Sequence, residues 1–282
     1  MPRPHSIIVL VLLASGPGLC VTPARAQGLE QIATPTEAHA ATAATAGSAE
    51  APAAPSYQDY FHALGYSFSR GLFAKEQILP LAIGSAASIA LLPVDRKVSD
   101  AVRGHADHLG KAGNIIGSPL VLGALGGGLM LGSLATDNSR FRAYAFTLSQ
   151  GLIVAGTIAT VSKLAVRRTR PNGENRRSFP SGHAAGMFAL AAVSSHYYGK
   201  KAGIPLYALA GTVAFSRVTS GRHFLSDVVA GAAIGYIAGR AAVLGTQHVT
   251  SAPQMTGIQR MMAMQQTMGA PPGGGLRICF SF

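Results

Sequence analysis

The feature that most limits the fold of this 282-residue chain is a series of six apolar stretches separated by short polar breaks. The stretches are rich in Ala, Leu, Met and Gly, and residues typical of β-strands are scarce, so each stretch favours a helix. The sequence therefore predicts an all-α fold, a helical bundle of about six core helices. The stretches run at about 77–94, 117–136, 143–163, 184–198, 203–216 and 228–245.

The composition predicts that this bundle is associated with a membrane. Charged residues make up 12% of the chain, about half of the ~25% usual in soluble domains, and hydrophobic residues make up 48%. This balance excludes disorder for the bulk of the chain and argues against an ordinary cytosolic enzyme. Gly231, Gly235 and Gly239 repeat every four residues and predict a ridge along which two helices approach closely. Because two of the stretches are short for a bilayer, a tightly packed soluble bundle is the alternative.

The N-terminal sequence predicts export. A short apolar run is followed by the small-x-small pattern Ala24-Arg25-Ala26, which is typical of a signal peptide cleavage site. The following Ala-, Thr- and Pro-rich tract has no aromatic residues and cannot bury a core. The expected parts are a signal peptide (1–26), a disordered linker (27–56), a helical domain (57–247) and a flexible Met- and Gly-rich tail (248–282).

Positive charge is concentrated in one part of the chain. The formal net charge is +12, and the segment from Lys163 to Asp227 holds ten Lys or Arg residues but only two acids, Glu174 and Asp227. Such a field attracts an anion, which can be a phosphate, a phospholipid surface or a nucleic acid. The alternative is a basic loop that faces solvent or the cytoplasm.

The first of three motifs in this segment joins Lys163 to Arg170 and Pro171. Positions seven apart on a helix are two turns apart, so we expect Lys163 and Arg170 to point the same way before Pro171 discourages the helix. Taken alone, a basic helix end that faces solvent or lipid headgroups explains this motif as well.

The second motif is Pro180-Ser181-Gly182-His183, followed by an apolar run. A helix that starts here leaves main-chain N–H groups without partners, and these form an anion site with His183 in the first turn. Taken alone, such a serine is more often only a helix cap, and such a histidine a surface residue.

The third motif contains Ser216-Arg217, His223 and Asp227. His223 and Asp227 are four residues apart, so on a helix the carboxylate can accept the Nδ1–H of the imidazole. That bond would fix the tautomer and leave Nε2 as a nucleophile. A His–Asp pair with this spacing is also common as a plain surface interaction.

Together, the pattern K-x6-R-P, then P-S-G-H, then S-R-x5-H-x3-D resembles the phosphatidic acid phosphatase type 2 superfamily. That superfamily also includes bacterial non-specific acid phosphatases and vanadium haloperoxidases. Every fixed position is matched, in order, between residues 163 and 227. The resemblance implies an all-α core and phosphatase chemistry for the helical domain.

The resemblance also implies a role for each motif residue. His223 would attack phosphorus and form a phosphohistidine, Asp227 would orient His223, and His183 would act as general acid and then as base. The implied phosphate-binding residues are Lys163, Arg170, Ser181, Gly182 and Arg217.

The resemblance implies neither a metal nor another cofactor. The only other metal-like spacing, His105-x-x-His108, has no further obvious ligand nearby in the sequence. Five further arginines of this segment are expected only to attract anions, namely Arg167, Arg168, Arg176, Arg177 and Arg222.

The favoured function is an exported phosphatase that acts on a lipid-linked phosphate monoester or pyrophosphate at a membrane, with no nucleic-acid partner. A soluble periplasmic acid phosphatase of broad specificity is the first alternative. A vanadium-dependent haloperoxidase, with His223 as the vanadate ligand, is a weaker one because such enzymes are generally larger chains. A catalytically silent anion- or lipid-binding protein is disfavoured by the presence of His183, His223 and Asp227.

The sequence gives two conflicting indications of membrane orientation. The short loop at Gly199-Lys200-Lys201 is basic and favours a cytoplasmic position, which places the motifs on the periplasmic side. The basic break at 95–114 would then also be periplasmic, which the same rule disfavours. The expected location is the inner membrane with a periplasm-facing site, or the periplasm itself.

Overall fold

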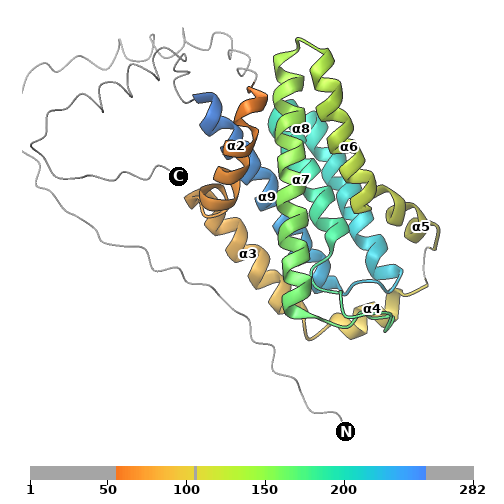
Figure 1. The fold of residues 1–282 in the computed structure, drawn as a ribbon. Coiled ribbons are helices and arrows are strands. Elements are labelled where there is room, and N and C mark those ends of the chain that lie inside the picture. The colour runs from red at the N-terminus through yellow and green to blue at the C-terminus, as the bar shows by residue number, and fades with distance from the viewer. Residues whose placement is uncertain (1–54, 105–106, 252–282) are drawn as a thin grey trace, which may run out of the picture. The chain divides into compact units, whose positions relative to one another are not determined.

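The computed structural model describes residues 55–104 and 107–251, and every regular element in those ranges is helical (Figure 1). The all-α prediction is therefore confirmed for this part of the chain. The predicted signal peptide, almost all of the predicted linker and the tail beyond residue 251 lie outside the described residues. The helices are η1 (Tyr57–Asp59), α2 (Tyr60–Tyr66), η2 (Ser67–Gly71), α3 (Lys75–Leu91), α4 (Asp95–Val102), α5 (Asp107–Ile116), α6 (Pro119–Gly132), η3 (Ser133–Ala135), α7 (Ser139–Val166), α8 (Gly182–Thr219) and α9 (Leu225–Ser251).

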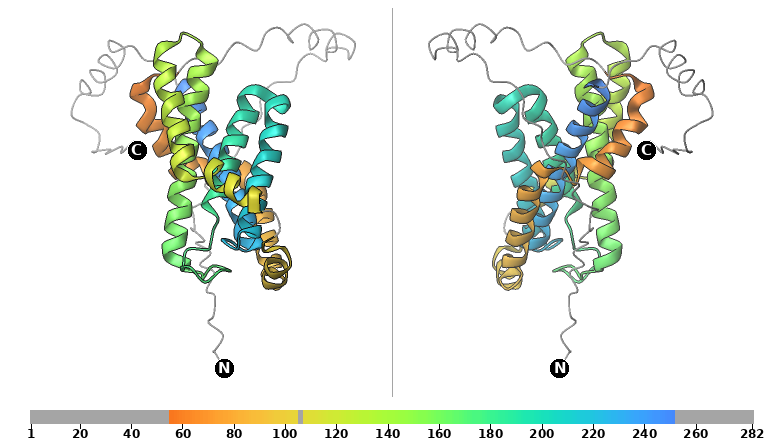
Figure 2. Two further views of the ribbon diagram at one scale, coloured as in Figure 1. Left: turned by 90° about the vertical axis from the view of Figure 1, so that its right-hand side faces the viewer. Right: turned by 90° about the vertical axis from the view of Figure 1, so that its left-hand side faces the viewer.

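Helix α8 folds back on itself and accounts for two of the predicted stretches. Gly199 breaks the helix with a φ of 70°, a left-handed conformation that costs little only for glycine. The two halves then run side by side, so that Phe188 and Tyr207 bring their ring centroids to 5.9 Å (Figure 2). Leu190 and Val193 of the first half share a hydrophobic core with Val213 of the second.

Helix α9 packs against the first half of α8 through its glycines. A Cβ atom at Gly231 would lie 2.4 Å from the main-chain oxygen of Ser181, and one at Gly235 would lie 2.1 Å from that of Ala185. At Gly239 the corresponding distance to Ala189 is 2.9 Å. The predicted close approach at this four-residue repeat is confirmed, and it fixes the start of α9 beside the start of α8.

The prediction that residues 95–114 form a polar break between helices is wrong, because most of this segment is helical. It forms α4 and the greater part of α5, and α4 buries Asp95 and Ser99. An amphipathic segment with many charges gives a weak apolar signal even when one face is buried. Helix α4 lies at the end of the bundle where α3 and α7 finish (Figure 1).

Within residues 55–104 and 107–251, three helical segments are long and apolar enough to cross a membrane: Gly110–Ala135, Ser139–Val166 and Leu225–Ser251. A fourth span is possible on the same criteria if α3 and α4, which are bent by 74°, count as one. Helix α3 also exposes much of its apolar surface, with Ile78, Leu79 and Ile83 each at least 60% exposed. Such a surface suits a lipid environment better than water.

Candidate active site

The three motifs meet at one end of the bundle, where α7 ends, α8 begins and ends, and α9 begins. The loop 167–181 leads from α7 into α8, and residues 220–224 connect α8 to α9. Ser181 in the first loop donates its main-chain N–H to the main-chain oxygen of Asp227, at 2.9 Å. This bond joins the first loop to the first turn of α9, and the main-chain N–H of Asn172 joins it to the second connection by donating to the main-chain oxygen of Gly221, at 3.0 Å.

Lys163 and Arg170 do not share a helix, so the expected two-turn spacing is wrong. Helix α7 ends at Val166 because Arg167 adopts a left-handed conformation, with φ 49°, four residues before Pro171. Lys163 stays in the last helical turn and donates to the main-chain oxygens of Arg177 and Pro180. The loop, rather than helical periodicity, carries Arg170 to the site.

Arg170 is largely buried and is paired with a carboxylate of its own loop. Its Nη1 lies 3.1 Å from Oε2 of Glu174, which is also 3.4 Å from Nη1 of Arg222. A hydrogen bond from the Asn172 side chain, the charge of Arg222 and that of Arg170 lower the pKa of Glu174. Glu174 therefore holds the two arginines beside each other.

The second motif starts α8 as predicted. Ser181 is the N-cap, with Oγ 3.4 Å from the main-chain nitrogen of Ala184, and it is fully buried. Its hydroxyl hydrogen remains available to another acceptor. A Cβ atom at Gly182 would be 3.9 Å from Cε of Lys163, so the lysine lies over the start of α8.

His223 is held by a main-chain oxygen rather than by a carboxylate. Its Nδ1 lies 2.6 Å from the carbonyl oxygen of Ser178, and the side chain is almost completely buried. A carbonyl oxygen only accepts hydrogen bonds, so Nδ1 carries the proton and Nε2 keeps its lone pair. The tautomer is the one that a nucleophilic Nε2 requires.

The predicted hydrogen bond from His223 to Asp227 is wrong. The Asp227 Oδ2 atom is 3.9 Å from Nδ1 of His223, which is too far for a hydrogen bond. That oxygen instead accepts from Ser178 Oγ at 2.5 Å and from the main-chain nitrogen of Phe224 at 2.9 Å. Asp227 thus holds the residue whose carbonyl holds His223, and it acts on the imidazole through Ser178.

Arg168 is a structural link and not a free surface cation, which corrects the expectation that it only draws anions near. Its Nη1 donates to Asp227 Oδ1 and its Nη2 to Asp95 Oδ2, both at 2.7 Å. Ser226 accepts a hydrogen bond from Arg168 at its hydroxyl, and it donates its main-chain N–H and its hydroxyl to the Asp95 carboxylate. The arginine therefore joins α4 and α9 to the end of α7.

Arg217 and His183 meet at Asn114 of α5. Arg217 Nη1 donates to Asn114 Oδ1 at 3.2 Å, and Nε2 of His183 lies 3.3 Å from the main-chain oxygen of Asn114. Among the described residues, the buried Nε–H groups of Arg170 and Arg217 have no hydrogen-bond partner. Buried donors without partners are costly, and an anion between these arginines would satisfy them.

The cations of all three motifs lie around the two histidines. Burial, together with the positive charges of Lys163, Arg170 and Arg217, holds the pKa of His223 well below its ordinary value. Burial and the same three charges lower the pKa of His183 to about 4. Both imidazoles are therefore neutral near pH 7 in the free protein.

A polar cavity of about 290 Å³ adjoins this cluster. It lies between α5 and the connection from α8 to α9, and its cationic lining residues are Lys111, Arg217 and Arg222. Asn114 also lines it, so the cavity opens next to His183. It can accept a second polar or anionic group of a molecule whose phosphate lies at His223.

The described residues contain no group of three or more His, Cys, Asp or Glu side chains placed to hold a metal ion. The side chains of His105 and His108 lie outside the described part of the chain. Three residues that organise the site were missed by sequence reasoning: Asp95, Asn114 and Ser178. Only Ser178 lies near a motif, and none has a spacing that points to its role.

The sequence comparisons agree with the motifs. Residues 144–250 match the family model of the PAP2 superfamily. Lipid A 1-phosphatase of Porphyromonas gingivalis is 39% identical over 94 residues, which cover 32% of this chain and 21% of that protein. Lipid A 4'-phosphatase of Helicobacter pylori is 35% identical over 94 residues, covering 32% of this chain and 48% of that protein. This chain therefore spans less than two thirds of either relative.

A solved structure shares the fold. The first transmembrane PAP2 type phosphatidylglycerolphosphate phosphatase from Bacillus subtilis superposes with a TM-score of 0.51 at 17% sequence identity. The superposition covers 65% of this chain and all of that one. The three motifs gather at one end of this helical bundle, and the segment that holds them, residues 144–250, belongs to the PAP2 superfamily.

Proposed function

We propose that this chain is a phosphatase that removes phosphate from a lipid-linked phosphate monoester or pyrophosphate through a phosphohistidine at His223. The observation that carries the proposal is the hydrogen bond that Nδ1–H of His223 donates to the main-chain oxygen of Ser178. This bond leaves Nε2 free among the cations Lys163, Arg170 and Arg217. A neutral nucleophile next to fixed positive charges suits attack on an anionic phosphate.

In the first step, Nε2 of His223 attacks phosphorus and the bond from phosphorus to the leaving oxygen breaks. The negative charge of the bound phosphate raises the pKa of His183, so His183 is protonated in the complex and gives its proton to that oxygen, and an alcohol or a phosphate leaves. Lys163, Arg170 and Arg217 hold the phosphate oxygens with Ser181 and the N–H of Gly182, and they stabilise the charge that builds up on those oxygens. Asp227 supports the imidazole through Ser178 rather than by direct contact.

In the second step, His183 takes a proton from water, whose oxygen attacks phosphorus of the phosphohistidine. The P–N bond breaks, its electron pair returns to Nε2 of His223, and inorganic phosphate leaves. His183 is again protonated and His223 is again neutral, so the cycle closes. None of these steps requires a metal or another cofactor.

The apolar helices and the names of the relatives support a lipid-linked substrate. Two relatives are lipid A phosphatases, so a lipid A phosphate is one candidate and a polyprenyl pyrophosphate is another. The cavity lined by Lys111 and Arg222 can hold a second anionic group of either substrate.

The test is phosphate release from lipid A, phosphatidate and a polyprenyl pyrophosphate in detergent, compared between wild type and His223→Ala. We expect the variant to lose at least about three orders of magnitude in kcat. The wild type, quenched during turnover of ³²P-labelled substrate, should carry alkali-stable, acid-labile label that His223→Ala lacks. Equal activity of the two proteins would refute the proposal, and activity without label would refute the intermediate.

We further propose that the protein is exported to the inner membrane with its site on the periplasmic side. The turn at Gly199, followed by Lys200 and Lys201, lies at the end of the bundle opposite the site, and its charge favours the cytoplasm. The test replaces Cys20 and Cys279 and introduces either Asn172→Cys or Lys201→Cys. A membrane-impermeant maleimide added to spheroplasts should label only the first, and the reverse result would invert the orientation.

A further inference from the structure

A second cavity lies along the side of the bundle, away from the motif residues. It has a volume of about 660 Å³ and is formed by α3, α8 and α9. Its walls are mostly apolar, including Pro80 and Ile83 of α3, Phe188 of α8 and Val229 of α9. Ile83 is 60% exposed, so this groove opens to the surroundings of the helices.

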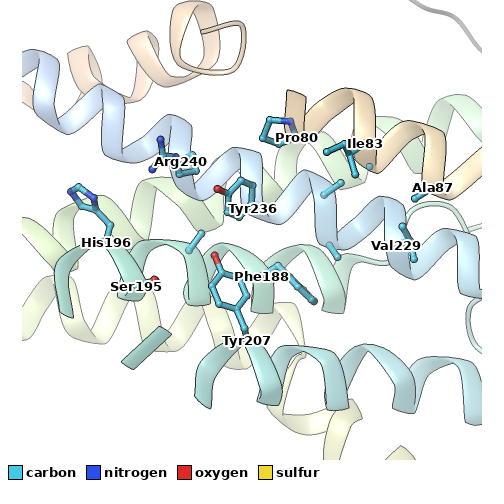
Figure 3. A pocket seen from close by; sticks show the side chains of 14 residues that line it. Pro80, Ile83, Ala87, Phe188, Ser195, His196, Tyr207, Val229, Tyr236 and Arg240 are labelled. Carbon is cyan, nitrogen blue, oxygen red and sulfur yellow. The ribbon is translucent and has the colours of Figure 1, made fainter. Parts of the chain in front are cut away.

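One end of the groove is polar. Figure 3 shows Arg240 and His196 at that end, Tyr236 and Tyr207 next to them, and Ala87 and Val229 at the other end. The groove therefore has the form of a lipid: a cationic, hydrogen-bonding end that continues into an apolar channel.

Arg240 is a charge inside a segment that is apolar enough to cross a membrane, Leu225–Ser251. Among the side chains of residues 55–104 and 110–251, its guanidinium forms no ion pair with an Asp or Glu. A cation in a membrane helix is costly without a counter-charge, and such residues usually face a partner group. The groove is where that partner would enter.

The polar end is too far from the catalytic residues to share a headgroup with them. Arg240 follows Asp227 by thirteen residues on the same helix, which is about 20 Å along the axis. A substrate with its phosphate at His223 would present the middle or end of its hydrocarbon chain to the Arg240 guanidinium, which is unfavourable. Across a hydrocarbon core of ~30 Å, Arg240 is nearer to the other leaflet, whose headgroups its long side chain can approach.

We propose that the groove between α3, α8 and α9 binds an anionic phospholipid from the leaflet opposite the catalytic residues. Its phosphate pairs with Arg240 and accepts hydrogen bonds from the Tyr207 and Tyr236 hydroxyls. One acyl chain lies along the groove past Phe188 toward Val229. Bound there, the lipid neutralises the membrane-embedded charge and fills the space between α3 and the α8–α9 pair.

The test measures lipid retention by the full chain. Wild type in mild detergent is exchanged into equal amounts of phosphatidylglycerol and phosphatidylcholine, and retained lipid is counted by native mass spectrometry. We expect one phosphatidylglycerol to be retained in preference to phosphatidylcholine. Arg240→Gln should lower that preference about tenfold, as expected when a charged hydrogen bond is lost, and Arg240→Lys should restore part of it.

Three variants separate this site from other sources of lipid binding. Lys201→Gln removes an exposed cation at the same end of the bundle, and Arg217→Ala removes a cation at the catalytic end; both should retain phosphatidylglycerol as the wild type does. Ala232→Leu fills the groove without changing charge and should lower retention while helical content by circular dichroism stays the same. Unchanged retention in Arg240→Gln or Ala232→Leu would overturn the proposal. The proposal would also be overturned if Lys201→Gln lowered phosphatidylglycerol retention as much as Arg240→Gln does. The same holds if Arg217→Ala were the only variant that lowered this retention.

Discussion

His223 is bound by Ser178 through a main-chain hydrogen bond of 2.6 Å, and the nearest carboxylate oxygen of Asp227 is 3.9 Å from the same nitrogen. A main-chain carbonyl cannot lose its acceptor function by side-chain substitution or by protonation. The imidazole tautomer therefore depends on where the loop 167–181 places Ser178, and Asp227 holds that loop. Asp227 is therefore a positioning residue: it acts on His223 through Ser178 and not by direct contact with the imidazole.

Replacing Asp227 with Asn should lower kcat by about 10–100-fold and leave KM nearly unchanged, the range seen when outer carboxylates that orient a histidine are changed. The variant weakens the bonds to Ser178 and Arg168, so the carbonyl that orients His223 becomes less well placed. Ser178→Ala keeps the carbonyl and loses only the bond to Asp227, so it should cost less than Asp227→Asn. Steady-state kinetics check both variants. A larger effect of Ser178→Ala, or an effect on KM alone, would contradict this role.

Replacing Arg168 with Ala should destabilise the protein by about 3–5 kcal/mol, because removing one partner leaves buried charges uncompensated. Asp95 and Asp227 are at most 1% exposed and both depend on this guanidinium. The matched control is Arg177→Ala, whose side chain is exposed and should change stability by no more than about 0.5 kcal/mol. Thermal unfolding in detergent checks the pair, and similar Tm shifts for both variants would refute the structural role.

The optimum of kcat/KM should lie on the acid side of pH 6.5. A histidine with a lowered pKa stays neutral as the pH falls and becomes charged only below that lowered value, so neutral His223 persists in acid. His183, with a pKa of about 4 in the free protein, gains its proton only in acid. The kcat profile should extend to higher pH, because a bound phosphate raises the pKa of His183.

Arg170→Gln removes one of the positive charges that lower both pKa values, so it should move the kcat/KM optimum to higher pH. Lys201→Gln, at the opposite end of the bundle, should leave the optimum where it is. Profiles measured from pH 3.5 to 9 with a soluble phosphate ester check both statements. An optimum above pH 7 in the wild type would show that the histidines are not perturbed in this way.

Gly235→Ala should destabilise the protein by about 1–3 kcal/mol, the cost typical of overpacking a close contact. The added methyl group would meet the main-chain oxygen of Ala185 at 2.1 Å, so α8 and α9 must separate. Gly211→Ala is the control, because no neighbouring atom lies within 4 Å of its Cβ position. Because Gly211 lies within α8, Gly211→Ala should instead stabilise the protein by about 0.4–1 kcal/mol. Urea or thermal unfolding distinguishes the two, and equal effects would contradict the packing described for Gly235.

The sequence alone determined the elements whose signal is local. The apolar stretches, with few residues typical of strands, predict α3, α6, α7, α9 and both halves of α8, because the composition of a stretch is a property of that segment alone. The glycine repeat predicts the close approach of α9 for the same reason. The ordered motifs name the residues around His223, because helix starts and histidine positions are fixed by short sequences.

Only the tertiary structure decided how those residues are connected. Asp95 and Asn114 reach the site from α4 and α5, far from the motifs in the chain, and nothing in their own surroundings in the sequence marks them. Helix α7 ends at Val166 because Arg167 adopts a left-handed conformation. Lys163 and Arg170 therefore lie on a helix and on a loop, although their seven-residue spacing fits two turns of one helix. Ser178 replaces Asp227 as the direct partner of His223 because the folded loop brings a carbonyl within 2.6 Å. Such hydrogen bonds depend on positions in space, which separation along the chain does not encode.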